Sequence, residues 1–260
     1  MKQNSARAIL EEREMNKMGL DTFTHNRNNI LDSPIDKLIE VLKREINEAH
    51  SEYNKLNDLE ERNPDRFKEL EEKANQAGHT LYSEMSGYIQ DATYLEEELF
   101  ALFEMKIIYA FKHLEINIKQ LLFAAYQDNY INRQFKWDSI VQFLNSKNII
   151  AKDLNEYENI NQLRIVNNSL KHSDKVIDQS IKNIPEFKEK ETLSYSDLEL
   201  FYNRIKMSPD IFLTSLVHFV FKDIYSFTDE RLFEIAKSFA LRMDKKDAIE
   251  FSDELLKLYK

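Results

Sequence analysis

The sequence has no cysteine and contains only three glycines and four prolines among 260 residues. Without cysteine the chain has no disulfide, thiolate metal ligand or thiol nucleophile. So few glycines and prolines leave little room for tight turns, which disfavours many-turned all-β folds and glycine-looped α/β folds. Charges interrupt every apolar run before the roughly 20 residues that cross a membrane, and the N-terminus lacks the apolar core of a signal peptide. We therefore expect a cytoplasmic protein with no membrane association.

The charge balance is acidic, with 46 acidic against 36 basic residues and a net charge of −10. This balance argues against binding nucleic acid through an overall positive field, although it leaves room for a local basic site. Hydrophobic residues make up 42% of the chain, which is long enough to bury a core in one or two domains.

Apolar residues recur at spacings of three and four along the whole chain, and no segment predicts a strand, so we expect an all-α fold. The predicted organisation is N-terminal helices and a charged antiparallel helical hairpin over residues 1–90, a helical bundle over 91–227 and a helical extension over 228–260. The apolar stripe of the hairpin is equally consistent with a partner helix from a second subunit, and a coiled-coil adaptor is a more distant alternative. The predicted helices cover residues 6–17, 33–62, 67–99, 99–126, 137–144, 153 or 155 to 172, 196 or 197 to 206, 208–227, 229–243 and 245–259.

Residues 174–194 are polar and contain Pro185, which predicts a long loop. Loops of this length in compact domains are typically functional or mobile.

Most catalytic signatures are absent from the sequence, including the P-loop, G-x-G-x-x-G, G-x-S-x-G, H-E-x-x-H and the EF-hand loop. No two of the six histidines lie three or four residues apart, so a multi-histidine metal site on one helix is not expected. We predict neither a metal nor a cofactor.

The segment from Asn159 to His172 has two distinct faces at 100° per residue. Its apolar residues cluster within roughly 120° and are expected to face the core: Ile160, Leu163, Val166 and Leu170. Its polar residues gather within roughly 80° on the other side: Asn161, Arg164, Asn168 and His172. Lys171 flanks this polar column.

The polar column suits phosphate chemistry. Arg164 offers a fixed fork of donors for phosphate oxygens, Asn168 can position a hydroxyl group, and His172 can accept and donate a proton near neutral pH. RNA supplies its own nucleophile, the 2′-hydroxyl group, so such a site requires no metal. The alternative is an ordinary solvated helix face.

The same segment resembles the signature helix of the HEPN superfamily, helical domains of many RNases in toxin–antitoxin, abortive-infection and CRISPR-linked systems. Residues 168–172 match the Asn-x-x-x-His part of that signature, and the long preceding helix with Glu104 and His113 resembles the first bundle helix of the family. Asn167 stands where the family has its arginine, and Arg164 lies one turn earlier. The resemblance covers residues 91–227.

The resemblance implies a homodimeric, metal-independent endoribonuclease that acts on RNA in phage defence or a toxin–antitoxin system, alongside an antitoxin or another defence protein. It implies catalytic roles for Arg164, Asn168 and His172 and substrate binding by Asn161 and Lys171. Two copies of the helix would line one cleft, with cations that include Lys175. The alternative is a non-catalytic dimerisation or partner-binding module of the same fold.

Other polar or aromatic residues are weaker candidates for a functional site. Trp137 is either a base-stacking platform or a core anchor. His113 and Glu115 either orient the motif helix or make surface contacts. The acidic run 96–98 is expected near the start of a helix, exposed to solvent.

Overall fold

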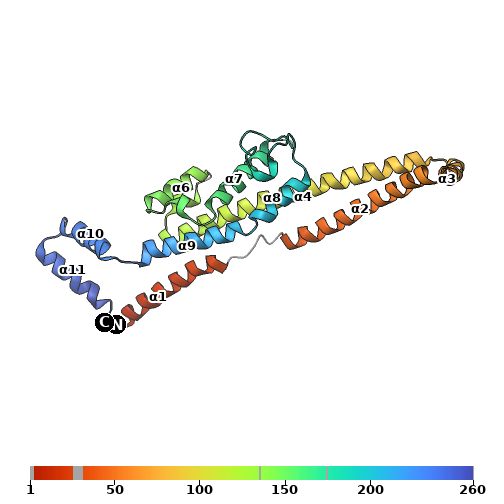
Figure 1. Ribbon diagram of the computed structural model, residues 1–260. Helices are drawn as coiled ribbons and strands as arrows, with labels where there is room; N and C mark the ends of the chain where they lie inside the picture. Colours follow the sequence, from red (N-terminus) through yellow and green to blue (C-terminus); the bar gives the residue numbers. More distant parts are fainter. Residues whose placement is uncertain (1–2, 26–31, 135, 174, 260) are drawn as a thin grey trace. The chain divides into compact units, whose positions relative to one another are not determined.

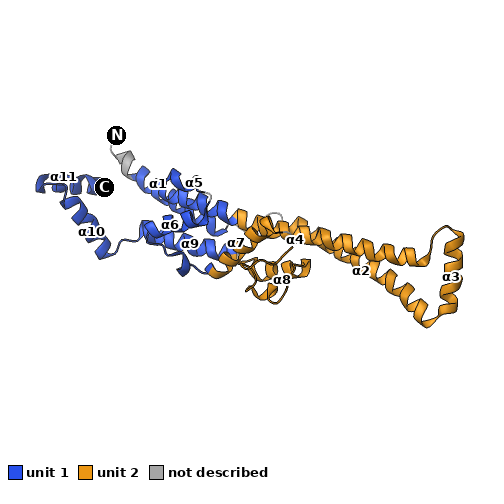
Figure 2. Ribbon diagram, turned by 90° about the horizontal axis from the view of Figure 1, so that it is seen from above, with its two compact units in different colours: residues 1–27, 114–157, 209–260 blue, residues 28–113, 158–208 orange. Residues whose placement is uncertain are grey.

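The computed structural model describes residues 3–25, 32–134, 136–173 and 175–259 (Figure 1). It confirms the all-α prediction, since the described residues form helices and no strand beyond an isolated antiparallel bridge between Val176 and Thr192. The chain divides into two compact units, coloured in Figure 2. Unit 1 contains residues 1–27, 114–157 and 209–260, and unit 2 contains residues 28–113 and 158–208. The sequential domain boundaries predicted above stay a prediction.

Unit 2 holds the helical hairpin and the motif helix. Its elements are α2 (Asp32–Arg62), α3 (Pro64–Gln76), the first part of α4 (Leu81–Tyr126), most of α7 (Tyr157–His172), the 3-10 turn η3 (Pro185–Phe187) and α8 (Tyr195–Ile205). The predicted end of the second helix at residue 62 is confirmed, since α2 ends at Arg62. Asn63 then caps α3 by accepting a hydrogen bond from the Arg66 amide, and Pro64 is the first residue of that helix. Four buried residues then join α3 to α4: Phe67, Ala74, Leu81 and Met85.

The predicted helix over residues 67–99 is wrong, because the chain breaks between α3 and α4. Gly78 has φ of 90°, a left-handed conformation that glycine adopts without steric cost. A Glu71 carboxylate oxygen accepts a hydrogen bond from the Leu81 amide at 2.6 Å, which caps the start of α4. From there α4 runs for 46 residues, so the acidic run 96–98 lies inside a helix and not at its start.

Buried Lys106 connects three helices of unit 2. Its ammonium group lies 2.5 Å from Asp36 Oδ1 and 3.8 Å from Asp32 Oδ1 on α2, and 4.5 Å from the centre of the Tyr202 ring on α8. The Tyr202 hydroxyl group donates to both Asp32 oxygens, at 2.6 and 2.7 Å. Lys43 adds an ion pair from α2 to Glu199 on α8. These charges fix α2 against α4 and α8.

The loop over residues 174–194 contains the turn η3 and contributes to the core of unit 2. Four of its apolar side chains are almost fully buried: Ile181, Ile184, Phe187 and Leu193. The Phe187 ring lies 5.4 Å from the Phe201 ring of α8. This segment therefore packs as a structural element although it is not a helix.

Ser194 and Asp197 form a capping box at the start of α8. Burial acts to raise the pKa of Asp197, but hydrogen bonds from Lys190, the Ser194 hydroxyl group and the Ser194 amide outweigh it and hold that pKa below its usual value. The charged carboxylate therefore stabilises the fold above its unfolded pKa of about 4, and this contribution is lost as the pH falls through the lower folded pKa.

We expect Asp197→Asn to lower the free energy of unfolding at pH 7 by about 1–2 kcal/mol, because the charge-assisted bonds of the capping box are lost. The variant should also lose less stability than the unchanged chain between about pH 4 and pH 2. Denaturant unfolding followed by circular dichroism measures both effects. Equal acid sensitivity of the two chains would contradict this account of Asp197.

Unit 1 contains the remaining elements. These are α1 (Gln3–Asp21), the 3-10 turns η1 (Thr22–His25) and η2 (Ala151–Asp153), the end of α4, and helices α5 (Asn129–Asn132), α6 (Trp137–Ser146), α9 (Ser208–Tyr225), α10 (Asp229–Ala240) and α11 (Lys245–Lys257). The predicted end of the first helix at residue 17 is wrong, since α1 continues to Asp21. No described helix combines the length and the apolar character that a membrane crossing needs.

Candidate functional site

Helix α7 is anchored by the apolar face that its sequence predicts. Ile160, Leu163 and Val166 are fully buried, and Leu170 is 6% exposed. The helix begins at Tyr157, two residues after the later of the two predicted starts, and ends at His172 as predicted. Because four aliphatic side chains are fixed in the core, the orientation of the opposite face is fixed as well.

The opposite face of α7 is accessible to solvent. Asn168, Lys171 and His172 are exposed, and Asn161 and Arg164 are half-buried. The Arg164 guanidinium donates from Nη2 and Nε to Asn161 Oδ1, at 2.9 and 3.3 Å. Asn161 therefore orients Arg164 through its oxygen, a contact that the predicted substrate-binding role of Asn161 did not include.

Asn167 occupies the position where the HEPN signature has arginine, and it is 1% exposed. Its side-chain amide donates to Asn168 Oδ1 at 3.1 Å. Its own Oδ1 atom is buried and has no hydrogen-bond partner within the described structure. Asn167 therefore faces the protein interior and positions Asn168, whereas Arg164 supplies the arginine on the accessible face.

We expect Asn167→Arg to lower the free energy of unfolding by about 3 kcal/mol, because a guanidinium would enter a buried position without a charged partner. Asn168→Arg is the matched control, since the neighbouring side chain is exposed. The control should change the melting temperature by no more than about 2 °C. If both variants melt alike, position 167 can accept an arginine at the surface and the assignment of Arg164 loses its structural basis.

A second polar cluster holds the first turns of α7 and was missed by the sequence analysis. Arg204 of α8 donates to Glu186 at 2.6 and 3.0 Å, to Asn159 Oδ1 at 2.8 Å and to Gln162 Oε1 at 2.8 Å. Burial acts to raise the pKa of Glu186, but the Arg204 hydrogen bonds outweigh it and hold that pKa below its usual value. Asn159 and Gln162 lie one helical turn apart, and this spacing is the sequence signal that a single donor could bind both side chains.

Lys175 was predicted to add a cation to the polar face of α7, but its side chain has other partners. It forms an ion pair with Glu97 of α4, and its ammonium group lies 4.7 Å from the centre of the Phe100 ring. Ser169, on the buried side of α7, donates to Asp178 Oδ2 at 2.7 Å. The segment after α7 is thus tied to neighbouring elements, and its lysine already has a carboxylate partner.

The other sequence candidates lie in structural contacts. Trp137 is half-buried with its ring 6.3 Å from the Phe212 ring, as a core anchor would be. Glu115 pairs with Lys119 on the next turn of α4. No group of three or more metal-ligating side chains is found in the described part of the chain.

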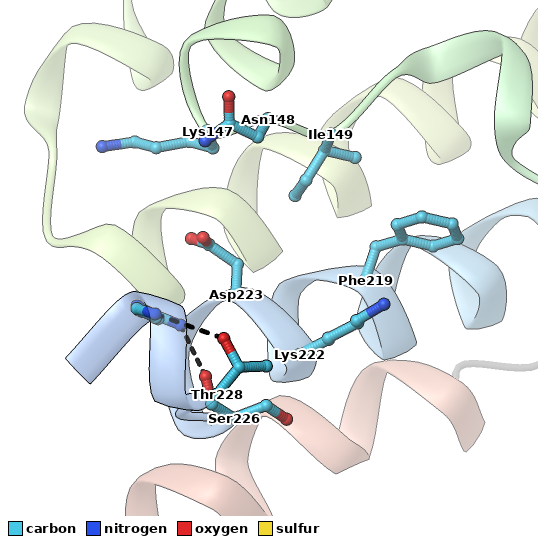
Figure 3. A pocket seen from close by; sticks show the side chains of 9 residues that line it. Lys147, Asn148, Ile149, Phe219, Lys222, Asp223, Ser226 and Thr228 are labelled. Carbon is cyan, nitrogen blue, oxygen red and sulfur yellow. Dashed lines mark hydrogen bonds between the residues drawn. The ribbon is translucent and has the colours of Figure 1, made fainter. Parts of the chain in front are cut away.

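A pocket of about 260 Å³ lies in unit 1 between residues 147–149, the end of α9 and the segment that leads into α10 (Figure 3). Its cations are Lys147, Lys222 and Arg231, but Lys147 and Lys222 extend to opposite sides, and the Asp223 carboxylate lies between them. Arg231 donates to the Ser226 carbonyl at 2.8 Å. Because these cations do not converge on one point, the pocket lacks the arrangement of donors that binds an anion.

Comparison with known proteins adds no assignment, since no family model, curated protein or solved structure matches the chain. Its function must therefore be argued from the accessible face of α7.

Proposed function

We propose that the chain is a metal-independent endoribonuclease of the HEPN type, and that α7 carries its catalytic side chains. The single observation that supports this most is the division of α7 into two faces. The helix buries four aliphatic side chains and leaves Asn168 and His172 exposed, with Arg164 oriented by Asn161 on the same side. An arginine, an amide and an imidazole on one face of a helix supply the kinds of group that phosphodiester cleavage requires.

In the proposed reaction, His172 removes the proton from an RNA 2′-hydroxyl group, whose oxygen attacks the adjacent phosphorus. The bond from phosphorus to the 5′-oxygen then breaks, and that oxygen takes up a proton from an imidazolium. Arg164 stabilises the additional negative charge on the phosphate in the transition state, and Asn168 orients the 2′-hydroxyl group. The products are a 2′,3′-cyclic phosphate and a free 5′-hydroxyl group.

The resemblance to the HEPN superfamily implies that two copies of this helix line one cleft. Two copies of Arg164, Lys171 and His172 would then form a local positive surface on an acidic protein. The proton donor for the leaving oxygen would come from the second copy of His172 in this arrangement.

The test is incubation of the purified chain with a mixed RNA in EDTA. We expect cleavage to continue without divalent ions and to stop at any position where a single 2′-deoxynucleotide replaces a ribonucleotide. Cleavage at the deoxy position would show that the 2′-hydroxyl group is not the nucleophile and would contradict the mechanism.

The second candidate is a non-catalytic partner-binding module of the same fold. The burial of Asn167 favours it, because the arginine position adjacent to Asn168 faces the interior. The net charge of −10 also opposes RNA approach. Absence of cleavage by the unchanged chain, together with capture of a protein partner that does not depend on His172, would favour this candidate.

A further inference from the structure

Asn167 and Asn168 form a pair of side-chain amides in which the second is held by the first. The Asn167 amide nitrogen donates to Asn168 Oδ1 at 3.1 Å, and Asn167 is itself 1% exposed. The oxygen and the nitrogen of a planar amide group point in different directions, so Asn168 Nδ2 is directed away from Asn167. Because Asn168 is exposed, this nitrogen presents its two donors at the surface of α7.

The same polarity holds along the whole polar face of α7. Asn161 Oδ1 accepts from Nε and Nη2 of Arg164, at 3.3 and 2.9 Å, so the side-chain oxygens of Asn161 and Asn168 are both engaged. Arg164 and Lys171 carry donors and no acceptor. Among the five predicted site side chains, the neutral imidazole of His172 is therefore the acceptor that is left for a substrate.

The fold retains Asn167 at a cost in stability. At 100° per residue, this position falls within the apolar arc of α7. The Asn167 Oδ1 atom is buried and has no hydrogen-bond partner in the described part of the chain. An unpartnered buried oxygen lowers the free energy of unfolding, whereas an aliphatic side chain in the same place would not. A residue that breaks the local pattern in this way typically serves a function.

The polarity of Asn168 decides how a 2′-hydroxyl group can bind beside it. Asn168 and His172 are four positions apart, so they are neighbours on the helix surface with Cβ atoms about 5–6 Å apart. A hydroxyl oxygen between them accepts from Asn168 Nδ2 and donates its own proton to the imidazole. If the Asn168 oxygen faced outward instead, it would compete with His172 for that proton.

We propose that Asn167 is a positioning residue, which holds the Asn168 nitrogen toward the substrate so that the 2′-hydroxyl proton is directed to His172. This role rests on the proposed nuclease activity of α7. It also supplies a reason for a buried asparagine at the position where the resembled family has arginine.

The first test is steady-state cleavage of an RNA of defined sequence by Asn167→Leu, which removes the donor and retains a side chain that branches at the same carbon. We expect kcat to fall at least about 10-fold, because the hydroxyl group loses its fixed orientation. KM should change by less than about two-fold, because Arg164 and Lys171 still contact the substrate. The melting temperature should not fall, because the unpartnered oxygen is removed as well. A variant that keeps full kcat would overturn the proposal.

The matched control is Ser169→Ala on the same helix. Ser169 is also buried, and it donates to Asp178 Oδ2 at 2.7 Å. This variant should lower the melting temperature and leave kcat unchanged, whereas Asn167→Leu should do the reverse. If both variants lose kcat in proportion to their loss of stability, Asn167 has only a structural role and the proposal is wrong.

A second test follows the side-chain amide protons by NMR and needs no RNA. In the unchanged chain, the Asn167 Nδ2 protons should exchange slowly with water and those of Asn168 rapidly, because only the former are buried. Protected Asn168 protons would show that Asn168 is the donor of the pair and would overturn the proposal. The expected exchange in a chain that cleaves no RNA would refute the nuclease activity and leave the fixed polarity of Asn168 standing.

Discussion

Replacing His172 with alanine should lower the rate of RNA cleavage at least about 100-fold, which is the usual cost of losing a general base or acid. The same change should shift the melting temperature by no more than about 2 °C, because His172 is exposed at the end of α7 and contributes little to packing. Cleavage assays at equal concentrations of folded protein, together with thermal unfolding, measure both effects.

The matched control is His218→Ala, which removes an exposed histidine from α9 and should leave cleavage unchanged. Arg164→Lys keeps the charge but loses the planar set of donors, so it should reduce the rate while retaining part of the activity. Full activity in His172→Ala would remove the imidazole from the mechanism.

Neutralising both carboxylates beside Lys106, as Asp32→Asn with Asp36→Asn, should lower the free energy of unfolding by about 3 kcal/mol. The physical reason is that Lys106 is only 4% exposed, so its ammonium group would be left in the interior without a counter-charge. Denaturant unfolding followed by circular dichroism measures the change.

Lys106→Met provides the contrasting variant. It removes the buried charge and retains most of the side-chain volume, so it should cost less than half as much stability as the paired asparagine variant. A Lys106→Met chain that is the less stable of the two would show that the ion pairs themselves, and not the avoidance of an unpaired charge, dominate this site.

The helices and their buried faces were largely predictable because spacing alone decides them. The four aliphatic residues of α7 are buried as their 3.6-residue period requires. The break at Gly78 was missed because the apolar stripe continues in step across it, whereas the backbone turn depends on a single left-handed residue. Periodicity therefore locates faces better than it locates helix ends.

The polar contacts around the candidate site were less predictable because they join residues that are far apart in the sequence. Arg204 meets Asn159 and Gln162 more than 40 positions away, and Lys106 meets Asp36 at a separation of 70. The burial of Asn167 beside exposed Asn168 was, by contrast, available from spacing, because at 100° per residue Asn167 falls within the apolar arc of α7 and Asn168 does not.

Analysis of the RNA ends produced in EDTA tests the central claim most directly. Mass spectrometry of the fragments should find a 2′,3′-cyclic phosphate on one side of each cut and a 5′-hydroxyl group on the other, because the 2′-oxygen is the proposed nucleophile and no metal-bound water is needed. Fragments that end in a 3′-hydroxyl group and a 5′-phosphate would show that water attacked the phosphorus and would contradict the proposed role of the α7 side chains.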